Sequence, residues 1–264
     1  MRVPVVQHRS RRRRALRRRA LWTGGELLVT TGVVLLLLVV HQLWWTNREA
    51  RRGADHQVQA LERQWATPGG GGGATPSANS GTAGGSSPSH PTATTSTDGS
   101  TPTTSPGSAT TPDRSQAYAV LTVPRLHLRV PIAEGVSKGN VLNKGYVGHY
   151  LGTQQPGQAG NFALAGHRNT HGEPFRYLNH LRVKDTVQVE TSAATFTYTV
   201  DKILPQTSAA DSGVIRPIPR STVKPPYGYS RPGYYITLTT CTPEYTSRYR
   251  MVVWGTLTSM RPRA

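Results

Sequence analysis

The sequence predicts an all-β domain attached to a single membrane-spanning helix. Three observations support this: a 19-residue apolar stretch near the amino terminus, a long stretch without large apolar residues after it, and short apolar segments punctuated by Gly, Pro and Asn from residue 118 onward. The last pattern is typical of a closed or nearly closed antiparallel barrel. Prolines recur throughout this last region and argue against long helices in it.

The amino-terminal elements are a basic segment over residues 1–25 and a transmembrane helix over residues 26–46. The basic segment holds nine arginines and no Asp or Glu, and the apolar stretch at residues 27–45 ends in two tryptophans. As a helix this stretch rises about 28 Å, close to the hydrocarbon core of a bilayer. A cleaved signal peptide is the alternative, but the bulky end of the stretch is a poor cleavage site. The positive-inside rule places the arginines in the cytoplasm, against lipid headgroups, and the rest of the chain outside.

The net charge of the chain indicates a partner only when its distribution along the sequence is considered. The full sequence has 31 Lys and Arg against 13 Asp and Glu, a net charge of +18, which commonly indicates nucleic acid. Half of this excess lies in residues 1–25, where arginines act as a topology signal, so we predict a contact with membrane lipid and no nucleic-acid partner.

The single cysteine and the scattered acidic residues limit the cofactors. One cysteine excludes an intrachain disulfide and a multi-cysteine metal site. The acidic residues of the folded region show no calcium-loop spacing. We therefore expect neither a metal nor a cofactor.

Two segments connect the predicted membrane helix to the folded domain. Residues 47–65 are rich in charge and are predicted to form a juxtamembrane segment with a short helix. Residues 66–117 are predicted to be a disordered Gly/Ser/Thr/Pro linker, because residues 66–113 contain no Val, Ile, Leu or aromatic residue to offset the entropy of ordering. Such a linker would separate the domain from the membrane.

The folded domain is predicted over residues 118–260, a length sufficient for one core. A short helix is expected over residues 174–181. The period-two alternation of residues 195–200, Thr-Phe-Thr-Tyr-Thr-Val, is typical of a half-buried strand. The candidate strands are residues 119–123, 128–132, 162–165, 186–190, 195–200, 234–240 and 251–257.

Cys241 follows the apolar run 234–240 and precedes a Thr-Pro turn, so it lies at a strand end, where reactive groups are often placed. A lone cysteine is most often a small buried apolar residue. A nucleophilic cysteine needs a base and a group that stabilises an oxyanion. His167 is the candidate base, because among the five histidines of the domain it has the best-defined place, directly after the run 162–165.

Arg250 is the candidate for the stabilising group. It opens the strand 251–257, and period-two alternation puts it on one face with Val252 and Trp254, which we expect to be the barrel interior. Arg248 shares that face and is the rival, although it is also the more typical surface residue.

These residues carry a family resemblance. The motif Thr-Leu-Thr-Thr-Cys at 237–241, the motif Ala-Gly-His-Arg at 165–168, and an arginine nine residues after the cysteine resemble the signature of the sortase family. Gly-Glu-Pro-Phe at 172–175 and Cys-Thr-Pro at 241–243 are similar to class E sortases of actinobacteria. The resemblance covers most of residues 120–256 and implies a sortase-type eight-stranded β-barrel with short helices.

The resemblance also implies an activity. The chain would be a membrane-anchored cysteine transpeptidase that cleaves a C-terminal sorting signal, of Leu-Ala-x-Thr-Gly or Leu-Pro-x-Thr-Gly type, between Thr and Gly through a thioacyl-enzyme. It would attach the cleaved protein to cell-wall peptidoglycan. The implied roles are Cys241 as nucleophile, His167 as general acid and base, Arg250 as substrate or oxyanion ligand, and Tyr150, Thr239 and Thr240 as substrate-binding residues. His171 departs from the tyrosine expected at its place.

The implied partners are secreted proteins that bear a sorting signal, and an amine acceptor on a peptidoglycan precursor. Two other functions remain open. One is a non-catalytic extracellular β-domain that binds wall polymer or peptide, whose basic surface would suit an anionic envelope. The other is a cysteine peptidase in which water resolves the thioacyl group. A binding module has no need of Cys, His and Arg together at strand ends, so the triad favours an enzyme.

Overall fold

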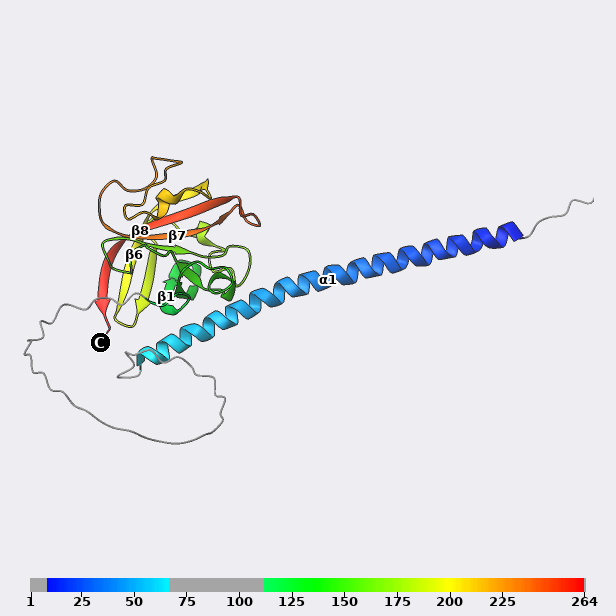
Figure 1. Cartoon of the computed structure of the whole chain (residues 1–264), viewed down its shortest axis with the longest axis horizontal. Coiled ribbons are helices and arrows are strands. Elements are labelled where there is room, and N and C mark those ends of the chain that lie inside the picture. The colour runs from blue at the N-terminus through cyan, green and yellow to red at the C-terminus, as the bar shows by residue number, and fades with distance from the viewer. Residues whose placement is uncertain (1–8, 67–111, 264) are drawn as a thin grey trace, which may run out of the picture.

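The computed structural model describes residues 9–66 and 112–263 of the chain. These residues form one long helix, α1 (Arg9–Ala66), and one barrel, which lies beside the carboxyl-terminal end of the helix (Figure 1). The first eight residues of the predicted basic segment and residues 67–111 of the predicted linker lie outside the described residues.

The barrel closes in the strand order β1-β2-β3-β4-β7-β8-β6-β5, which confirms the predicted eight-stranded all-β architecture. The pairs β2/β3 and β4/β7 are parallel, and the other neighbours are antiparallel. The strands are β1 (Ala117–Val123), β2 (Leu128–Glu134), β3 (Val147–His149), β4 (Gly160–Ala165), β5 (Thr186–Thr191), β6 (Ala194–Ser208), β7 (Tyr234–Thr242) and β8 (Tyr249–Pro262).

The connections contain four 3₁₀ turns: η1 (Pro124–Leu126), η2 (Leu142–Lys144), η3 (Leu178–His180) and η4 (Ser212–Ile215). The short helix expected over residues 174–181 is reduced to turns and η3. Strand β3 was not predicted from sequence, because three residues are too few to show an alternation. Strands β6 and β8 extend beyond their predicted ends, because they pair with each other from Ala194/Pro262 to Ser208/Tyr249; three register shifts interrupt this pairing.

The two faces of β8 pack into different clusters. Met251 and Val253 lie in the main core inside the barrel. Val252 and Trp254 pack instead with Leu204 and Val214 in a second cluster on the other face. The alternation was therefore predicted correctly, but the face that includes Arg250 is not the barrel interior. The connection between β6 and β7, through η4, covers this outer face and buries Trp254.

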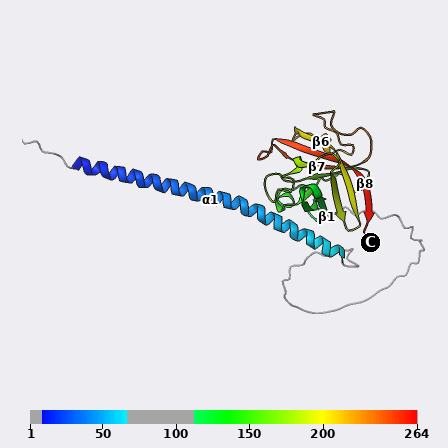
Figure 2. The same cartoon turned by 180° about the vertical axis from the view of Figure 1, so that it is seen from behind.

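Helix α1 is long and apolar enough from Leu21 to Ala66 to cross a membrane, with a mean hydropathy of 2.1 in its most apolar part. Most of it projects away from the barrel, and only its carboxyl-terminal end lies against the barrel in both views (Figures 1 and 2). There, Val58 and Leu61 pack on Val120, which points outward from β1. The carboxyl-terminal end of the helix thus contacts the barrel directly.

Candidate active site

His167 and Cys241 lie at the same end of two adjacent parallel strands. The last pair between β4 and β7 joins Ala165 to Thr239. His167 follows Ala165 by two residues, and Cys241 follows Thr239 by two residues. Both residues therefore lie at the same edge of the sheet, just beyond the last pair of the two strands. Cys241 is a free, partly exposed thiol. The parallel pairing brings together two residues that are 74 positions apart in the sequence.

Arg250 lies directly opposite Cys241 across the antiparallel pair β7/β8. Its Nη1 donates to the carbonyl oxygens of Ser247 at 2.9 Å and Tyr249 at 3.0 Å. A guanidinium has five N–H donors, so these two contacts leave other donors for a substrate. Arg248 is exposed and lies over the ring of Tyr249, 5.3 Å from its centroid. The register therefore favours Arg250 over Arg248 as the partner of Cys241.

The His167 imidazole has two neighbours from different parts of the chain. Its Nε2 lies 2.9 Å from Oδ1 of Asn143, at η2, and its ring stacks on His171 with centroids 5.4 Å apart. Burial and the charges of His171 and Lys138 lower the pKa of His167 from its ordinary value. A lowered pKa favours the neutral imidazole, which can accept a proton.

Arg168 is a buried guanidinium that contacts the cysteine strand. Its Nη1 donates to the carbonyl oxygen of Cys241 at 3.3 Å and to Oγ1 of Thr242 at 3.0 Å. Its Nη2 donates to Oδ1 of Asn179 at 3.3 Å, and its Nε, within the described part of the chain, is buried without a partner. A buried cation is costly unless it is compensated, so this charge would favour negative charge that develops beside Cys241.

The three predicted substrate-binding residues connect β7 to neighbouring segments: Thr239 and Thr240 to β4 and its end, and Tyr150 from the turn after β3. Oη of Tyr150 lies 3.1 Å from Oγ1 of Thr239. The Thr239 hydroxyl also donates to the carbonyl of Leu164 at 3.1 Å, and that of Thr240 donates to the carbonyl of Gly166 at 2.8 Å. Both threonine side chains are buried. Their hydroxyls thus maintain the alignment of the strands that carry His167 and Cys241, while Tyr150 is partly exposed.

The surroundings of His149 distinguish it from the proposed acid and base, His167. Its Nδ1 lies 2.7 Å from a carboxylate oxygen of Glu134, and both side chains are almost fully buried. Its Nε2 lies 2.9 Å from Oγ1 of Thr153. These partners belong to the barrel itself, so the role assigned to His149 is structural: it supports the turn that carries Tyr150. In the described ranges 9–66 and 112–263, no group of three His, Cys, Asp or Glu side chains could hold a metal ion.

Sequence reasoning assigned no role to Asn143, Arg168 or His171 at this site. Arg168 could have been suspected, because it directly follows His167 in the sequence. His171 lies in the same loop and was noted only as a departure from the resemblance. Asn143 offered no signal, because it lies 24 residues before His167 and reaches it only through the fold.

The chain is similar to known proteins over the barrel. A family model of the sortase domain matches residues 121–258. Sortase SrtE1 of Streptomyces coelicolor is 52% identical over 154 residues, which are 56% of this chain and 42% of SrtE1. Sortase SrtE2 of the same organism is 35% identical over 150 residues, 55% of this chain and 57% of SrtE2. The chain thus spans less than two thirds of the length of these relatives.

A solved structure is similar over the same region. It is the crystal structure of Sortase E1 from Streptomyces coelicolor with a tripeptide in the active site. The match has a TM-score of 0.53 and 51% sequence identity, and it covers 56% of this chain and 92% of that chain.

Proposed function

Because the chain belongs to the sortase family, we propose that it is a membrane-anchored cysteine transpeptidase that cleaves a sorting signal between Thr and Gly and transfers the threonine to an amine of a peptidoglycan precursor. The observation that carries the proposal is the arrangement around Cys241. His167 lies at the same end of the neighbouring parallel strand, and Arg250 lies directly opposite on the other side.

The first half-reaction needs a nucleophile, an acid and a group that accepts negative charge. The Cys241 thiolate attacks the threonine carbonyl, whose oxygen becomes an oxyanion. The unused N–H donors of Arg250 are available to that oxygen. Protonated His167 gives its proton to the glycine nitrogen as the Thr–Gly bond breaks. The products are a thioacyl-enzyme and a free glycine amine, and His167 is left neutral.

The second half-reaction runs in the opposite direction with a different amine. Neutral His167 accepts a proton from the incoming amine, which attacks the thioacyl carbonyl. The new amide forms, the C–S bond breaks, and Cys241 leaves as a thiolate. The lowered pKa of His167 suits this step, because it favours the form that accepts the proton.

The substrate proposal rests on the resemblance of the motifs and on the structure of a relative. Sortase E1 of Streptomyces coelicolor holds a tripeptide in its active site, which supports a peptide substrate for this chain. We assign the sorting signal to the Leu-Ala-x-Thr-Gly type, with Leu-Pro-x-Thr-Gly as the second candidate. Tyr150 is the predicted contact for the signal, and Thr239 and Thr240 remain predicted substrate-binding residues at the base of the site.

The proposed location is supported by α1. Its apolar part is long enough to cross a bilayer, and the arginines before it would remain in the cytoplasm. The proposed topology is a single-pass membrane protein with its amino terminus in the cytoplasm and the barrel outside. That side of the membrane holds both secreted proteins and peptidoglycan precursors.

The test is a transpeptidation assay with the full chain in lipid nanodiscs. The protein is incubated with a Leu-Ala-x-Thr-Gly peptide, with or without triglycine as amine, and the products are identified by mass spectrometry. We expect a ligated peptide–triglycine product and a thioacyl adduct on Cys241. A parallel incubation with a Leu-Pro-x-Thr-Gly peptide ranks the two signals.

The controls separate the competing functions. Cys241→Ala should abolish both the adduct and the product, and cleavage by this variant would refute the nucleophile assignment. Cleavage that yields only the free acid at saturating triglycine would identify a peptidase instead. A chain that neither cleaves nor forms an adduct, yet retains the peptide, would be a binding module.

A further inference from the structure

The end of α1 contacts the loop that carries the proposed acid and base. We infer that Asn47 and Arg51, in the first helical turns after the apolar stretch, are positioning residues for His167. They would hold the His167 loop, residues 167–176, in its reactive geometry. This inference rests on the proposed transpeptidase function and adds a role for the membrane helix in it.

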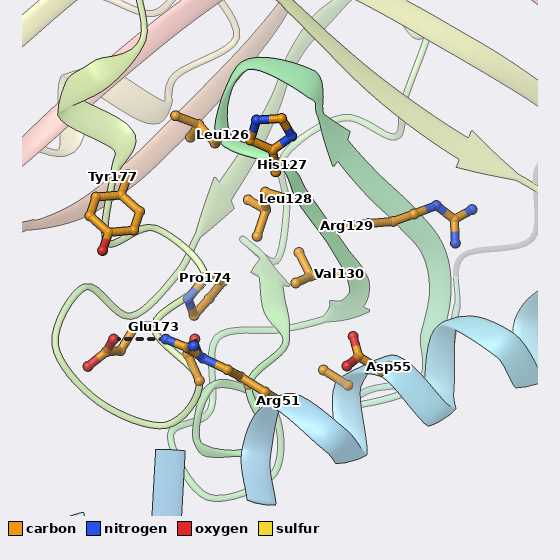
Figure 3. A pocket seen from close by; sticks show the side chains of 13 residues that line it. Arg51, Asp55, Leu126, His127, Leu128, Arg129, Val130, Glu173, Pro174 and Tyr177 are labelled. Carbon is orange, nitrogen blue, oxygen red and sulfur yellow. Dashed lines mark hydrogen bonds and ion pairs between the residues drawn. The ribbon is translucent and has the colours of Figure 1, made fainter. Parts of the chain in front are cut away.

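The contacts are polar and specific. Oδ1 of Asn47 accepts from the backbone N–H of Gly172 at 3.3 Å, and its Nδ2 donates to Oε1 of Glu173 at 2.9 Å. Nε of Arg51 donates to the carbonyl oxygen of Gly172 at 3.0 Å, and its Nη2 donates to Oε2 of Glu173 at 3.1 Å. Figure 3 shows Arg51 extending from the helix to Glu173 in the loop. Two side chains of α1 thus satisfy both backbone groups of Gly172 and both oxygens of Glu173.

The backbone of this part of the loop needs such support. His171, Gly172 and Glu173 have φ values of +53°, +83° and +54°. The left-handed region is ordinary for glycine, but non-glycine residues adopt it at a cost and keep it only when their surroundings impose it. The surroundings that bond to Gly172 and Glu173 include Asn47 and Arg51. Removal of these contacts is therefore expected to let the loop relax.

The relaxing segment is directly coupled to His167. His171 stacks on the His167 ring, and the backbone N–H of Phe175 donates to the carbonyl oxygen of His167 at 3.0 Å. The same helix also packs against the turn that carries Asn143, the other neighbour of His167. A Cβ at Gly145 would lie 2.8 Å from the carbonyl oxygen of Ala50, so α1 packs closely on the end of η2, the turn that presents Asn143.

The contacts continue to the segment after Cys241. Glu173 also accepts from Nη1 of Arg176 at 2.8 Å. Nη2 of Arg176 in turn donates to Oη of Tyr245 at 3.1 Å and pairs with a carboxylate oxygen of Glu244 at 3.2 Å. Glu173 is therefore shared between α1 and the connection from β7 to β8. A change at the helix would reach both sides of the active site.

The polar contacts can be removed without releasing the helix. A cavity of about 250 Å³ lies between α1 and the barrel beside Arg51 (Figure 3), so packing is incomplete there, and the Arg51 side chain is 59% exposed. The apolar attachment lies further along the helix, at Val58 and Leu61. Loss of Asn47 and Arg51 should thus change the loop while α1 remains docked.

The test compares the double variant Asn47→Ala/Arg51→Ala with the wild-type full chain in nanodiscs. Arg52→Ala is the matched control, because it removes an exposed arginine from the next position of the same helix. We expect kcat of the double variant to fall about 10- to 100-fold, because small misplacements of a catalytic group have effects of this size. KM for the peptide should stay near the wild-type value. The single variant Arg51→Lys should have a kcat between those of the wild type and the double variant. Lysine keeps the positive charge, but its ammonium cannot reproduce the two-pronged contact of the guanidinium.

Hydrogen exchange supplies a readout that does not depend on activity. Amides of residues 168–176 should exchange faster in the double variant, while β1 amides opposite Val58 remain protected. Unchanged exchange in the loop overturns the inference, and so does faster exchange with an unchanged kcat. If the wild-type chain shows no transpeptidation, the proposed function fails, and with it the catalytic role of these residues. The exchange measurement then still decides whether α1 holds the loop.

Discussion

Arg168 donates a hydrogen bond from Nη1 to the carbonyl oxygen of Cys241 at 3.3 Å, so the residue after the proposed base contacts the proposed nucleophile through its backbone. The same nitrogen donates to Oγ1 of Thr242. Arg168 as a whole residue is only 8% exposed. It therefore places a fixed positive charge beside the position where a thiolate and an oxyanion develop.

This relationship predicts a loss of activity for Arg168→Met. The variant keeps a long side chain but removes the charge and all three hydrogen bonds of the guanidinium, and kcat/KM is expected to fall about 100- to 1,000-fold, as for loss of an oxyanion ligand. Arg168→Lys should lie between, because an ammonium retains the charge without the planar fork. Steady-state cleavage of the sorting-signal peptide is the measurement. Arg182→Met, at an exposed position of similar chemistry, is the control. Equal rates for Arg168→Met and wild type would contradict the assignment.

The β7/β8 register predicts that the two candidate arginines differ. Arg250→Ala should lower kcat/KM about 100- to 1,000-fold, because Arg250 is opposite Cys241 and has N–H donors available for the proposed oxyanion. Arg248→Ala should stay within about twofold, since an exposed cation contributes little. Both variants are compared in the same peptide assay. A larger loss for Arg248→Ala would reverse the assignment.

The stacking of His171 on His167 predicts a shift in the pH dependence. The charge of His171 helps to lower the pKa of His167, after burial, so His171→Phe should raise that pKa while it keeps an aromatic ring at the position. The limb of the kcat/KM profile that reports the protonation of His167 should therefore move to higher pH. NMR titration of the His167 ring gives the pKa directly. His180→Phe, where the histidine stacks on Tyr177 instead, should leave the profile in place. A downward shift in His171→Phe would show that the two rings do not interact in this way.

The buried pair of Glu134 and His149 predicts a large effect on stability. Glu134→Ala leaves the nearly inaccessible His149 ring without its 2.7 Å partner, and the free energy of unfolding is expected to fall by about 3–5 kcal/mol. Urea unfolding followed by tryptophan fluorescence measures the change. Arg125→Ala, which breaks a partly exposed pair with Asp185, should cost no more than about 1 kcal/mol. Similar losses for the two variants would mean that burial does not determine how much each pair contributes to the free energy of unfolding.

The sequence alone determined the class of the molecule. Apolar runs of strand length, with punctuation by Gly and Pro, are local properties, and so are the length of the apolar helix and the motifs around Cys241 and His167. A period-two pattern also determined that Arg250, Val252 and Trp254 share a face. It could not determine which face is the interior, because both faces of β8 are covered by apolar groups, one by the barrel and one by the connection from β6 to β7.

Only the tertiary structure decided which residues surround the site. The parallel register of β4 and β7 aligns His167 with Cys241, and the closed barrel brings Asn143 to His167 from a separate turn. The docking of α1 on the loop at Gly172 and Glu173 joins segments more than 120 residues apart. Local patterns hold no information on such contacts, because they depend on how the barrel closes and on which outer face the helix covers.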